Sequence, residues 1–276
     1  MLVNSNEILR QASLSTYAIP SPDFFNQNSL KAYIEVAEEF NKPIIIAYSG
    51  NFKTNFLTLE DAAVIGRYYA EKAKVPVCLH IDHGYNLDFI KKAIDLGFTS
   101  VMIDGSNDSY DVNVKKTKEI VDYAKGKNVS VEAEIGHVGS GQNYENEEEN
   151  DSIYTDVKEC IDFVEATGIN SVAVSIGTAH GIYTGGTPKL NFKRLEELKE
   201  AMDIPLVLHG SSSSGDANLK KCAELGISKI NLFTDIVTGG YKELKASKAE
   251  NFIDMVADGD EGLKKVLRHY YNLFGK

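Results

Sequence analysis

The amino-acid sequence predicts an α/β fold, a (β/α)8 TIM barrel built by a single domain over residues 1–276, with a helical tail from about residue 242 to residue 276. Short runs rich in β-branched residues alternate with longer amphipathic stretches, which is typical of a parallel sheet with crossover helices. Eight such runs form one series without a linker, which favours a closed barrel over an open doubly wound sheet. The length of 276 residues also suits a barrel, which typically takes about 250 residues.

The predicted strands are short and rich in valine, isoleucine and other apolar residues. They are Thr16–Ile19, Pro43–Tyr48, Pro76–His80, Ser100–Ile103, Ser130–Glu134, Ser171–Ser175, Pro205–Leu208 and Lys229–Leu232. In a barrel these strands run parallel, so that all their carboxyl ends meet at one rim. Barrel enzymes hold their catalytic residues at that rim.

Amphipathic stretches between the strands are the predicted helices. They are Leu30–Phe40, Leu59–Lys72, Leu87–Leu96, Asn113–Lys125, Val157–Thr167, Phe192–Ala201 and Asp216–Leu225. Gly97, Gly168 and Gly226 follow three of them, as expected for helix C-caps. We expect the tail to form one or two helices that pack under the barrel or against another subunit.

Composition limits the partners of this chain. The formal net charge of −11 argues against nucleic acid, because phosphate contacts there require a basic patch. A phosphorylated small substrate remains compatible, since backbone amides at helix N-termini can bind phosphate. No apolar stretch reaches the ~18 residues of a membrane span, so no membrane partner is expected. Without a signal-peptide pattern or a CxxC spacing, the sequence predicts a cytoplasmic protein without a disulfide framework.

Three histidines each close a short apolar run: His83, His180 and His209. A histidine at one strand end is more often a satisfied polar residue than a ligand. Three of them at one rim predict a metal site, because imidazole is the commonest metal-binding side chain. Three protein ligands and an open position are typical of catalytic rather than structural zinc.

Carboxylates lie near these histidines in the predicted barrel. Asp82 directly precedes His83 and is free to transfer a proton while a histidine binds metal. Asp104 follows the fourth predicted strand, and Glu132 and Glu134 lie in the fifth. Acids inside a barrel are costly unless they are paired or bound to metal. We expect them to orient the histidines, to bind an alternative metal position, or to form a purely structural network.

A serine-rich loop, Gly210–Gly215, follows the seventh predicted strand and opens a helix. Asn231–Asp235 ends the eighth strand at the same rim. Barrels often bind phosphate with the loops after strands seven and eight. The two segments therefore predict a phosphate site, with an ordinary polar turn as the alternative.

The segment Gly139–Asp151 follows the fifth predicted strand and is strongly acidic. A solvated loop and a mobile lid over the catalytic rim are both compatible with this pattern.

Five motifs resemble the class II, zinc-dependent ketose-bisphosphate aldolases, which include the fructose- and tagatose-bisphosphate aldolases. The motifs are Leu79-His-Ile-Asp-His-Gly84, Val131-Glu-Ala-Glu-Ile-Gly136, Ala173-Val-Ser-Ile-Gly-Thr-Ala-His-Gly181, Leu208-His-Gly-Ser-Ser-Ser-Ser214 and Lys229-Ile-Asn-Leu-Phe-Thr-Asp235. The resemblance extends from about Tyr17 to Asp235 in the order and spacing of the family, and the tail matches poorly.

The resemblance implies a role for each motif residue. The implied Zn2+ ligands are His83, His180 and His209, and the implied second metal position has Asp104 and Glu134. Asp82 would exchange the proton of the C4 hydroxyl of the ketose. The implied dihydroxyacetone phosphate ligands are Gly181, Gly210, Ser212, Asn231 and Thr234. A monovalent cation, Na+ or K+, is implied near Ala179, Gly181 and Gly210.

The sequence departs from the family at three places. The loop after the fifth strand has Gln142 and Asn143 where the family has the acid that exchanges the proton on the enediolate carbon. An amide cannot do this, so we expect Glu145, or one of Glu147 to Glu149, to do so. The Asp-Pro-Arg associated with the far phosphate has no counterpart after Lys242, and Phe233 stands where members often have a small or acidic residue.

We therefore expect a class II aldolase that reversibly cleaves a phosphorylated ketose to dihydroxyacetone phosphate and an aldehyde. The substrate is either a fructose-bisphosphate-like sugar or a ketose 1-phosphate, and the first and second departures favour the latter. Gly136-His-Val-Gly139 and Tyr144-Glu145 resemble family members that act on ketose 1-phosphates. A barrel metallohydrolase and a catalytically altered sugar-phosphate-binding barrel are the alternatives. A homodimer or homotetramer is expected.

Overall fold

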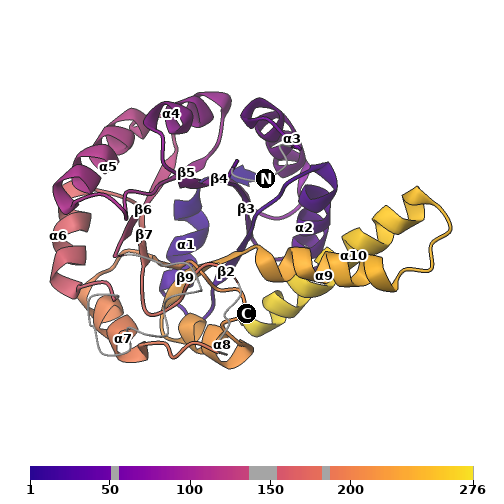
Figure 1. The fold of residues 1–276 in the computed structure, drawn as a ribbon. Helices are drawn as coiled ribbons and strands as arrows, with labels where there is room; N and C mark the ends of the chain where they lie inside the picture. The colour runs from indigo at the N-terminus through magenta and orange to yellow at the C-terminus, as the bar shows by residue number, and fades with distance from the viewer. Residues whose placement is uncertain (51–55, 137–153, 182–186, 276) are drawn as a thin grey trace.

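A computed structural model describes residues 1–50, 56–136, 154–181 and 187–275, and it has the predicted barrel (Figure 1). All strand pairs are parallel. The strands are β1 (Leu2–Val3), β2 (Ile19–Pro22), β3 (Ile44–Tyr48), β4 (Val77–Gly84), β5 (Ser100–Ile103), β6 (Ser130–Ile135), β7 (Ser171–Val174), β8 (Leu206–Leu208) and β9 (Ile227–Leu232).

The strands from β4 to β9 pair in chain order, and β9 then pairs with β2. β3 pairs with β4, and the ring closes where the amide of Phe24 donates to the carbonyl of Ala47 over 2.8 Å. β1 is a short additional strand beside the first residues of β4. The closed parallel ring confirms the (β/α)8 prediction.

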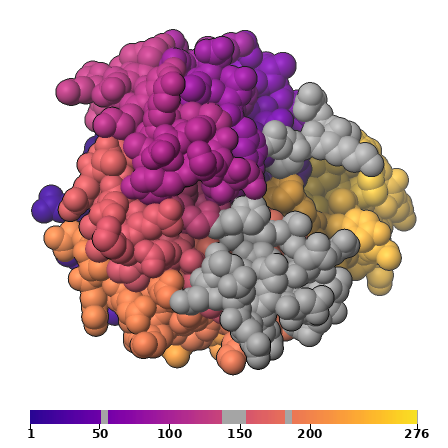
Figure 2. Space-filling view, turned by 60° about the vertical axis from the view of Figure 1, so that its left-hand side comes forward, coloured from indigo at the N-terminus to yellow at the C-terminus, as the bar shows by residue number. Residues whose placement is uncertain are grey.

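Helices surround this ring, and several begin and end as the sequence predicts. They are α1 (Ser5–Ser13), α2 (Gln27–Phe40), α3 (Leu59–Lys72), α4 (Leu87–Leu96), α5 (Tyr110–Ala124), α6 (Val157–Thr167), α7 (Phe192–Ala201), α8 (Asp216–Glu224), α9 (Thr234–Ala246) and α10 (Phe252–Leu273). Gly97 and Gly168 adopt the left-handed C-cap conformation expected of them. Figure 1 shows α4 to α8 following one another around the ring, and the colours of Figure 2 run in the same order, from purple at the top to orange at the bottom.

Helix α1, which the sequence does not predict, closes the amino-terminal end of the barrel. Its Ile8, Leu9 and Ala12 pack against Ile19, Ile45 and Cys78 from the first residues of three strands. Since α1 fills this end of the barrel interior with apolar side chains, the interior opens to solvent at the opposite rim.

The prediction of a strand at Thr16–Ile19 is wrong, because the strand is Ile19–Pro22. Pro20 and Pro22 lack an amide donor, which argues against a strand in the sequence. They are tolerated because β2 has regular pairing with β9 alone, while its link to β3 is the isolated bridge at Asp23.

The C-terminal tail forms an antiparallel hairpin of α9 and α10 that projects beyond the ring of helices (Figure 1). Helix α9 begins at Thr234, directly after β9, so the tail starts earlier than residue 242. The last turns of α10 return to the barrel, where Tyr270, Tyr271 and Phe274 are buried. In the described part of the chain, no helix is both long enough and apolar enough to cross a membrane.

Candidate metal and phosphate site

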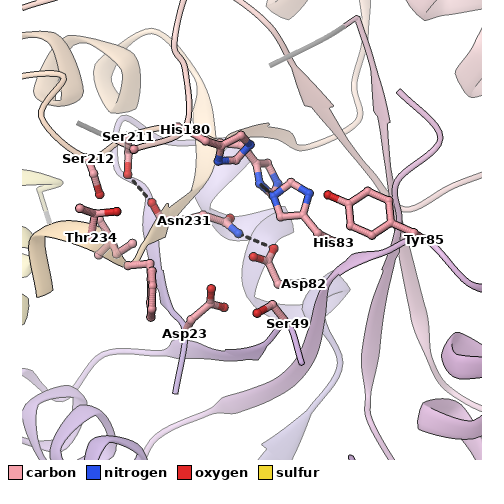
Figure 3. Close-up of a pocket in the computed structure, with 15 residues that line it drawn as sticks. Asp23, Ser49, Asp82, His83, Tyr85, His180, Ser211, Ser212, Asn231 and Thr234 are labelled. Atoms are coloured by element: carbon pink, nitrogen blue, oxygen red, sulfur yellow. Dashed lines mark hydrogen bonds between the residues drawn. The ribbon is translucent and has the colours of Figure 1, made fainter. Parts of the chain in front are cut away.

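A cavity of about 330 Å³ opens at the carboxyl ends of the strands (Figure 3). It is lined by Asp23, Ser49, Asp82, His83, Tyr85, His180, Gly181, His209, Gly210, Ser211, Ser212, Asn231, Leu232, Phe233 and Thr234. The cavity therefore collects residues from β4 and β9 and from the segments that follow β2, β3, β7 and β8.

The three predicted metal-binding histidines meet in this cavity. His83, His180 and His209 each offer a ring nitrogen, and these nitrogens lie within 4.8 Å of one another. The ring centroids of His83 and His180 are 4.9 Å apart, and those of His83 and His209 are 4.5 Å apart. This spacing suits one ion held from β4 and from the loops after β7 and β8.

A β-bulge turns Asp82 and His83 into the same cavity. Neighbouring residues of a regular strand point to opposite faces. Here the register between β4 and β5 shifts between Ile81 and Gly84, and His83 has a φ of 49°. Such a conformation is strained for a residue with a side chain, and it is commonly found at functional sites. The bulge thus places a proton-transfer group next to a metal-binding group.

Each of two histidines is oriented by a carboxylate. His83 Nδ1 lies 2.8 Å from Asp104 Oδ2, and His209 Nε2 lies 3.1 Å from Glu132 Oε1. Because an ionised carboxylate only accepts hydrogen bonds, these two ring nitrogens are the donors. The lone pairs therefore lie on the other two nitrogens, His83 Nε2 and His209 Nδ1, which face each other across 3.0 Å.

Two facing lone pairs at this distance require a positive charge between them. Burial alone would lower the pKa of His83, but the charges of Asp82 and Asp104 raise it to about 10. Burial and the neighbouring His83 hold the pKa of His209 well below its usual value, so its ring stays neutral. The proton on His83 supplies that charge here, and a Zn2+ ion held by His83, His180 and His209 would supply it in its place; with carboxylates behind His83 and His209, the residues present fit that ion.

A buried network continues from Glu132 into the centre of the barrel. Lys229 Nζ donates to both carboxylate oxygens of Glu132 over 2.9 and 2.8 Å and lies 3.0 Å from His80 Nε2. His80 Nδ1 lies 2.8 Å from Ser100 Oγ. Lys229 and Glu132 are almost completely buried, so the ammonium group balances the carboxylate that orients His209.

Asp82 is held from one side by Asn231, whose Nδ2 donates to Asp82 Oδ1 over 2.6 Å (Figure 3). A second carboxyl group, that of Asp23, faces Asp82 in the cavity. Burial and the nearby charge of Asp82 raise the pKa of Asp23 well above its usual value. Among the described atoms, Asp23 Oδ1 and Asn231 Oδ1 are buried without a hydrogen-bond partner.

The predicted phosphate residues gather at the other side of the cavity. Gly210 has a φ of 67°, and a Cβ there would lie 2.7–2.9 Å from backbone atoms of Ala179. The loops after β7 and β8 are therefore in backbone contact, which brings Gly181 and Gly210 to one wall. Ser212 and Thr234 line the same wall (Figure 3), with Thr234 at the first turn of α9.

The residues of the second predicted metal position, Asp104 and Glu134, also lie close together. Oxygens of Asp104 and Glu134 lie within 4.8 Å of a ring nitrogen of His83 and of each other. The monovalent cation predicted near Ala179, Gly181 and Gly210 stays a prediction. Glu145 lies outside the described residues, as do Gln142, Asn143 and Glu147 to Glu149.

Sequence reasoning missed several residues of the cavity. Asp23 follows β2 directly, so a correct assignment of that strand would have found it at the rim. Tyr85 follows the bulge and stacks on His83, with an angle of 14° between the rings. Lys229 pairs with Glu132 inside the barrel, and nothing in the sequence indicates this particular partner.

The whole chain is similar to known aldolases. A family profile described as class-II fructose-bisphosphate aldolase matches residues 3–276. The crystal structure of the YdjI aldolase from Escherichia coli K12 has 33% sequence identity and a TM-score of 0.90, covering 100% of this chain and 98% of that chain. Fructose-bisphosphate aldolase (Fba) from Campylobacter jejuni has 22% identity and a TM-score of 0.81, covering 99% and 95%; at this identity the likeness shows the fold alone.

Proposed function

Because this chain belongs to the class-II fructose-bisphosphate aldolase family, a family of carbon–carbon lyases, we propose that it is a zinc-dependent enzyme that reversibly cleaves a phosphorylated ketose. The products are dihydroxyacetone phosphate and an aldehyde. The observation that carries the proposal is a single cavity in which three histidine nitrogens lie within 4.8 Å of one another, with Asp82 on one side and the phosphate residues on the other.

The three histidines hold Zn2+ in this proposal. When bound, the ion supplies Lewis-acid stabilisation of the negative charge that cleavage leaves on the substrate ketone oxygen. Asp104 and Glu132 hold the rings of His83 and His209 in the orientation that exposes their lone pairs.

Asp82 is the proposed base for the C4 hydroxyl. It takes the hydroxyl proton in cleavage and returns it in condensation. Asn231 fixes the orientation of the carboxylate through the 2.6 Å hydrogen bond to Oδ1. The acid that exchanges the proton on the carbon next to the ketone is assigned to Glu145 as a prediction from the sequence. No Schiff-base lysine is required, and the ammonium group of Lys229 is already occupied by Glu132.

The phosphate of dihydroxyacetone phosphate is assigned to the wall formed by Gly181, Gly210, Ser212, Asn231 and Thr234. This assignment is supported by the first turn of α9, which begins at Thr234 on the cavity wall and whose amides favour an anion.

The remaining part of the substrate decides between a bisphosphate and a ketose 1-phosphate. Among the described residues that line the cavity, no lysine or arginine is present, and the carboxyl group of Asp23 is buried there. This composition favours a far end rich in hydroxyls. A cytoplasmic location and a homodimeric or homotetrameric assembly stay predictions.

Solvent proton exchange into dihydroxyacetone phosphate tests the proposal. The purified protein should exchange a C3 proton, a chelator should abolish the exchange, and added Zn2+ should restore it.

Asp82→Asn should remove cleavage of the ketose and retain exchange, because Asp82 acts on a different proton. Asp88→Asn, an acid in the first turn of α4 outside the cavity, is the matched control and should retain both. Absence of chelator-sensitive exchange would overturn the proposed function. A panel of aldehydes in the condensation direction would then identify the substrate.

A further inference from the structure

The C-terminal helix contacts the loop Gly210–Gly215, which we call the serine loop. The hydroxyl group of Tyr270, near the end of α10, donates to Asp235 Oδ2 over 2.5 Å. The amide of Ser213 donates to the same oxygen over 3.2 Å. One carboxylate oxygen thus joins the helix to the middle of the loop.

A second contact joins Asp235 to the serine loop in the opposite direction. The amide of Asp235 lies 3.4 Å from Ser212 Oγ, at the wall of the cavity. Ser213, the next residue, has a φ of 63°, which is unfavourable for any residue other than glycine. Such a conformation persists only where the surroundings hold it, and the Asp235 carboxylate is the group that holds the Ser213 amide.

Helix α10 provides a firm support for this contact. Tyr270 is 4% exposed and stacks on Phe274, which is also buried. The hydroxyl group of Tyr271 donates to the carbonyl of Pro43 over 3.0 Å, and its ring stacks on Phe40 of α2. His269 Nε2 lies 3.0 Å from Asp216 Oδ1 in the first turn of α8, directly after the serine loop.

The charge of Asp235 also needs compensation at this position. A carboxylate beside a phosphate site repels the ligand unless donors occupy it. Two donors, from Tyr270 and Ser213, share Asp235 Oδ2. Burial and the contact with Asp235 raise the pKa of Tyr270, so its hydroxyl group remains a donor throughout the working pH range.

We propose that Tyr270 and Asp235 are positioning residues for phosphate binding: α10 holds the serine loop in the conformation that receives the phosphate of the substrate. The proposal rests on the proposed function, since it assigns the residues that support the phosphate wall. It gives the C-terminal helix, which lies outside the five sequence motifs, a part in substrate affinity.

Two neighbouring tyrosines of α10 provide a matched test. Tyr270→Phe removes the hydroxyl group that contacts Asp235, whereas Tyr271→Phe removes one that contacts Pro43, away from the serine loop. Dissociation constants for inorganic phosphate and dihydroxyacetone phosphate, and kcat and KM for cleavage, are measured for both variants. Zn2+ affinity and thermal stability are measured alongside.

Tyr270→Phe should raise both dissociation constants and KM about 3- to 10-fold, the effect of about one hydrogen bond, with kcat within about twofold and Zn2+ affinity unchanged. Tyr271→Phe should leave ligand affinity unchanged although it also loses one buried hydrogen bond. Asp235→Asn keeps an acceptor oxygen and should preserve most of the affinity, whereas Asp235→Ala should weaken binding at least as much as Tyr270→Phe.

Unchanged ligand affinity in Tyr270→Phe, or equal weakening in Tyr271→Phe, would overturn the positioning role. The proton-exchange assay on the unmodified protein separates this failure from failure of the function. If exchange is present and Tyr270→Phe binds ligand normally, only the positioning role is lost. If the unmodified protein shows no exchange and binds neither phosphate probe, both proposals are overturned.

Discussion

The two sides of the cavity are built differently. On the histidine side, side chains from the barrel interior carry the chemistry, and each partner is itself on a strand or at a strand end: Asp104 behind His83, Glu132 behind His209. On the proposed phosphate side, glycines and short hydroxyl side chains line the wall, and α10 contacts Asp235 beside it from outside the ring of strands. A metal site can thus be completed within the sheet, whereas a loop site needs a second element to fix its backbone.

Substitutions on the two sides of the cavity should therefore have different effects on stability and on binding. The histidine side contains a buried charge pair, in which loss of one partner leaves the other charge without compensation. The phosphate side depends on single hydrogen bonds, each with a modest net contribution to stability. Substitutions on the histidine side should therefore affect folding and metal binding, and those on the phosphate side mainly ligand affinity.

The largest effect is expected for Lys229→Met. It leaves the Glu132 carboxylate unpaired in the barrel, where both side chains are about 1–2% exposed. We expect a loss of roughly 3–5 kcal/mol in the free energy of unfolding, measured by denaturant titration. Lys158→Met, which breaks the exposed pair with Asp162, should cost less than about 1 kcal/mol.

The double variant Lys229→Met/Glu132→Gln refines this test. The introduced glutamine side chain is neutral, and its amide oxygen can still accept the hydrogen bond from His209 Nε2, so most of the lost stability should return. A Lys229→Met protein as stable as the Lys158→Met control would contradict the charge-balance role of Lys229.

The next largest effect is expected for Asp104→Ala. The variant removes the partner of His83 Nδ1, and loss of such a contact typically lowers metal affinity by about 10- to 100-fold. Competition with a chelator measures the Zn2+ affinity. Asp108→Ala, in the same loop but paired with Lys116 on the surface, is the control and should bind Zn2+ normally. Equal affinities of the two variants would show that Asp104 does not orient the histidine.

The smallest effect is expected at the surface of α10. The hydrogen bond and charge of Arg268 hold the pKa of Glu39 below its usual value, and this contact ties α10 to α2. The stabilisation is therefore fully present above the unfolded pKa of Glu39 and is lost as pH falls through the lower folded value. Unfolding of the protein and of Glu39→Gln should differ by less than about 1 kcal/mol at pH 7, because the pair is exposed. The difference should disappear in acid, and a pH-independent difference would contradict this origin.

The sequence predicts the histidine side better than the phosphate side, for a physical reason. A histidine in a strand or directly after it is placed by the strand itself, so His83 and His209 could be assigned to one rim, and His180 reaches the same rim from the loop after β7. The bulge at His83 could not be predicted, because it depends on the register between β4 and β5.

The other features that the sequence did not predict depend on contacts between elements that are distant in the chain. Lys229 meets Glu132 only when opposite strands of the barrel close around a common interior. Helix α1 was not predicted, and its place is set by packing against the amino-terminal end of the barrel. Strand β2 was misplaced because it contains two prolines. Tyr270 has no signal in the sequence that would link it to the serine loop, since α8, β9 and α9 lie between the loop and α10 in the chain.

The position of Tyr270 has a consequence for synthesis of the protein. Tyr270 follows Asp235 by 35 residues, so their contact forms only after the residues that line the cavity have been synthesised. The three histidines and their carboxylate partners all leave the ribosome earlier. A nascent barrel can therefore bring its three histidines together first, and the serine loop gains its support from α10 last.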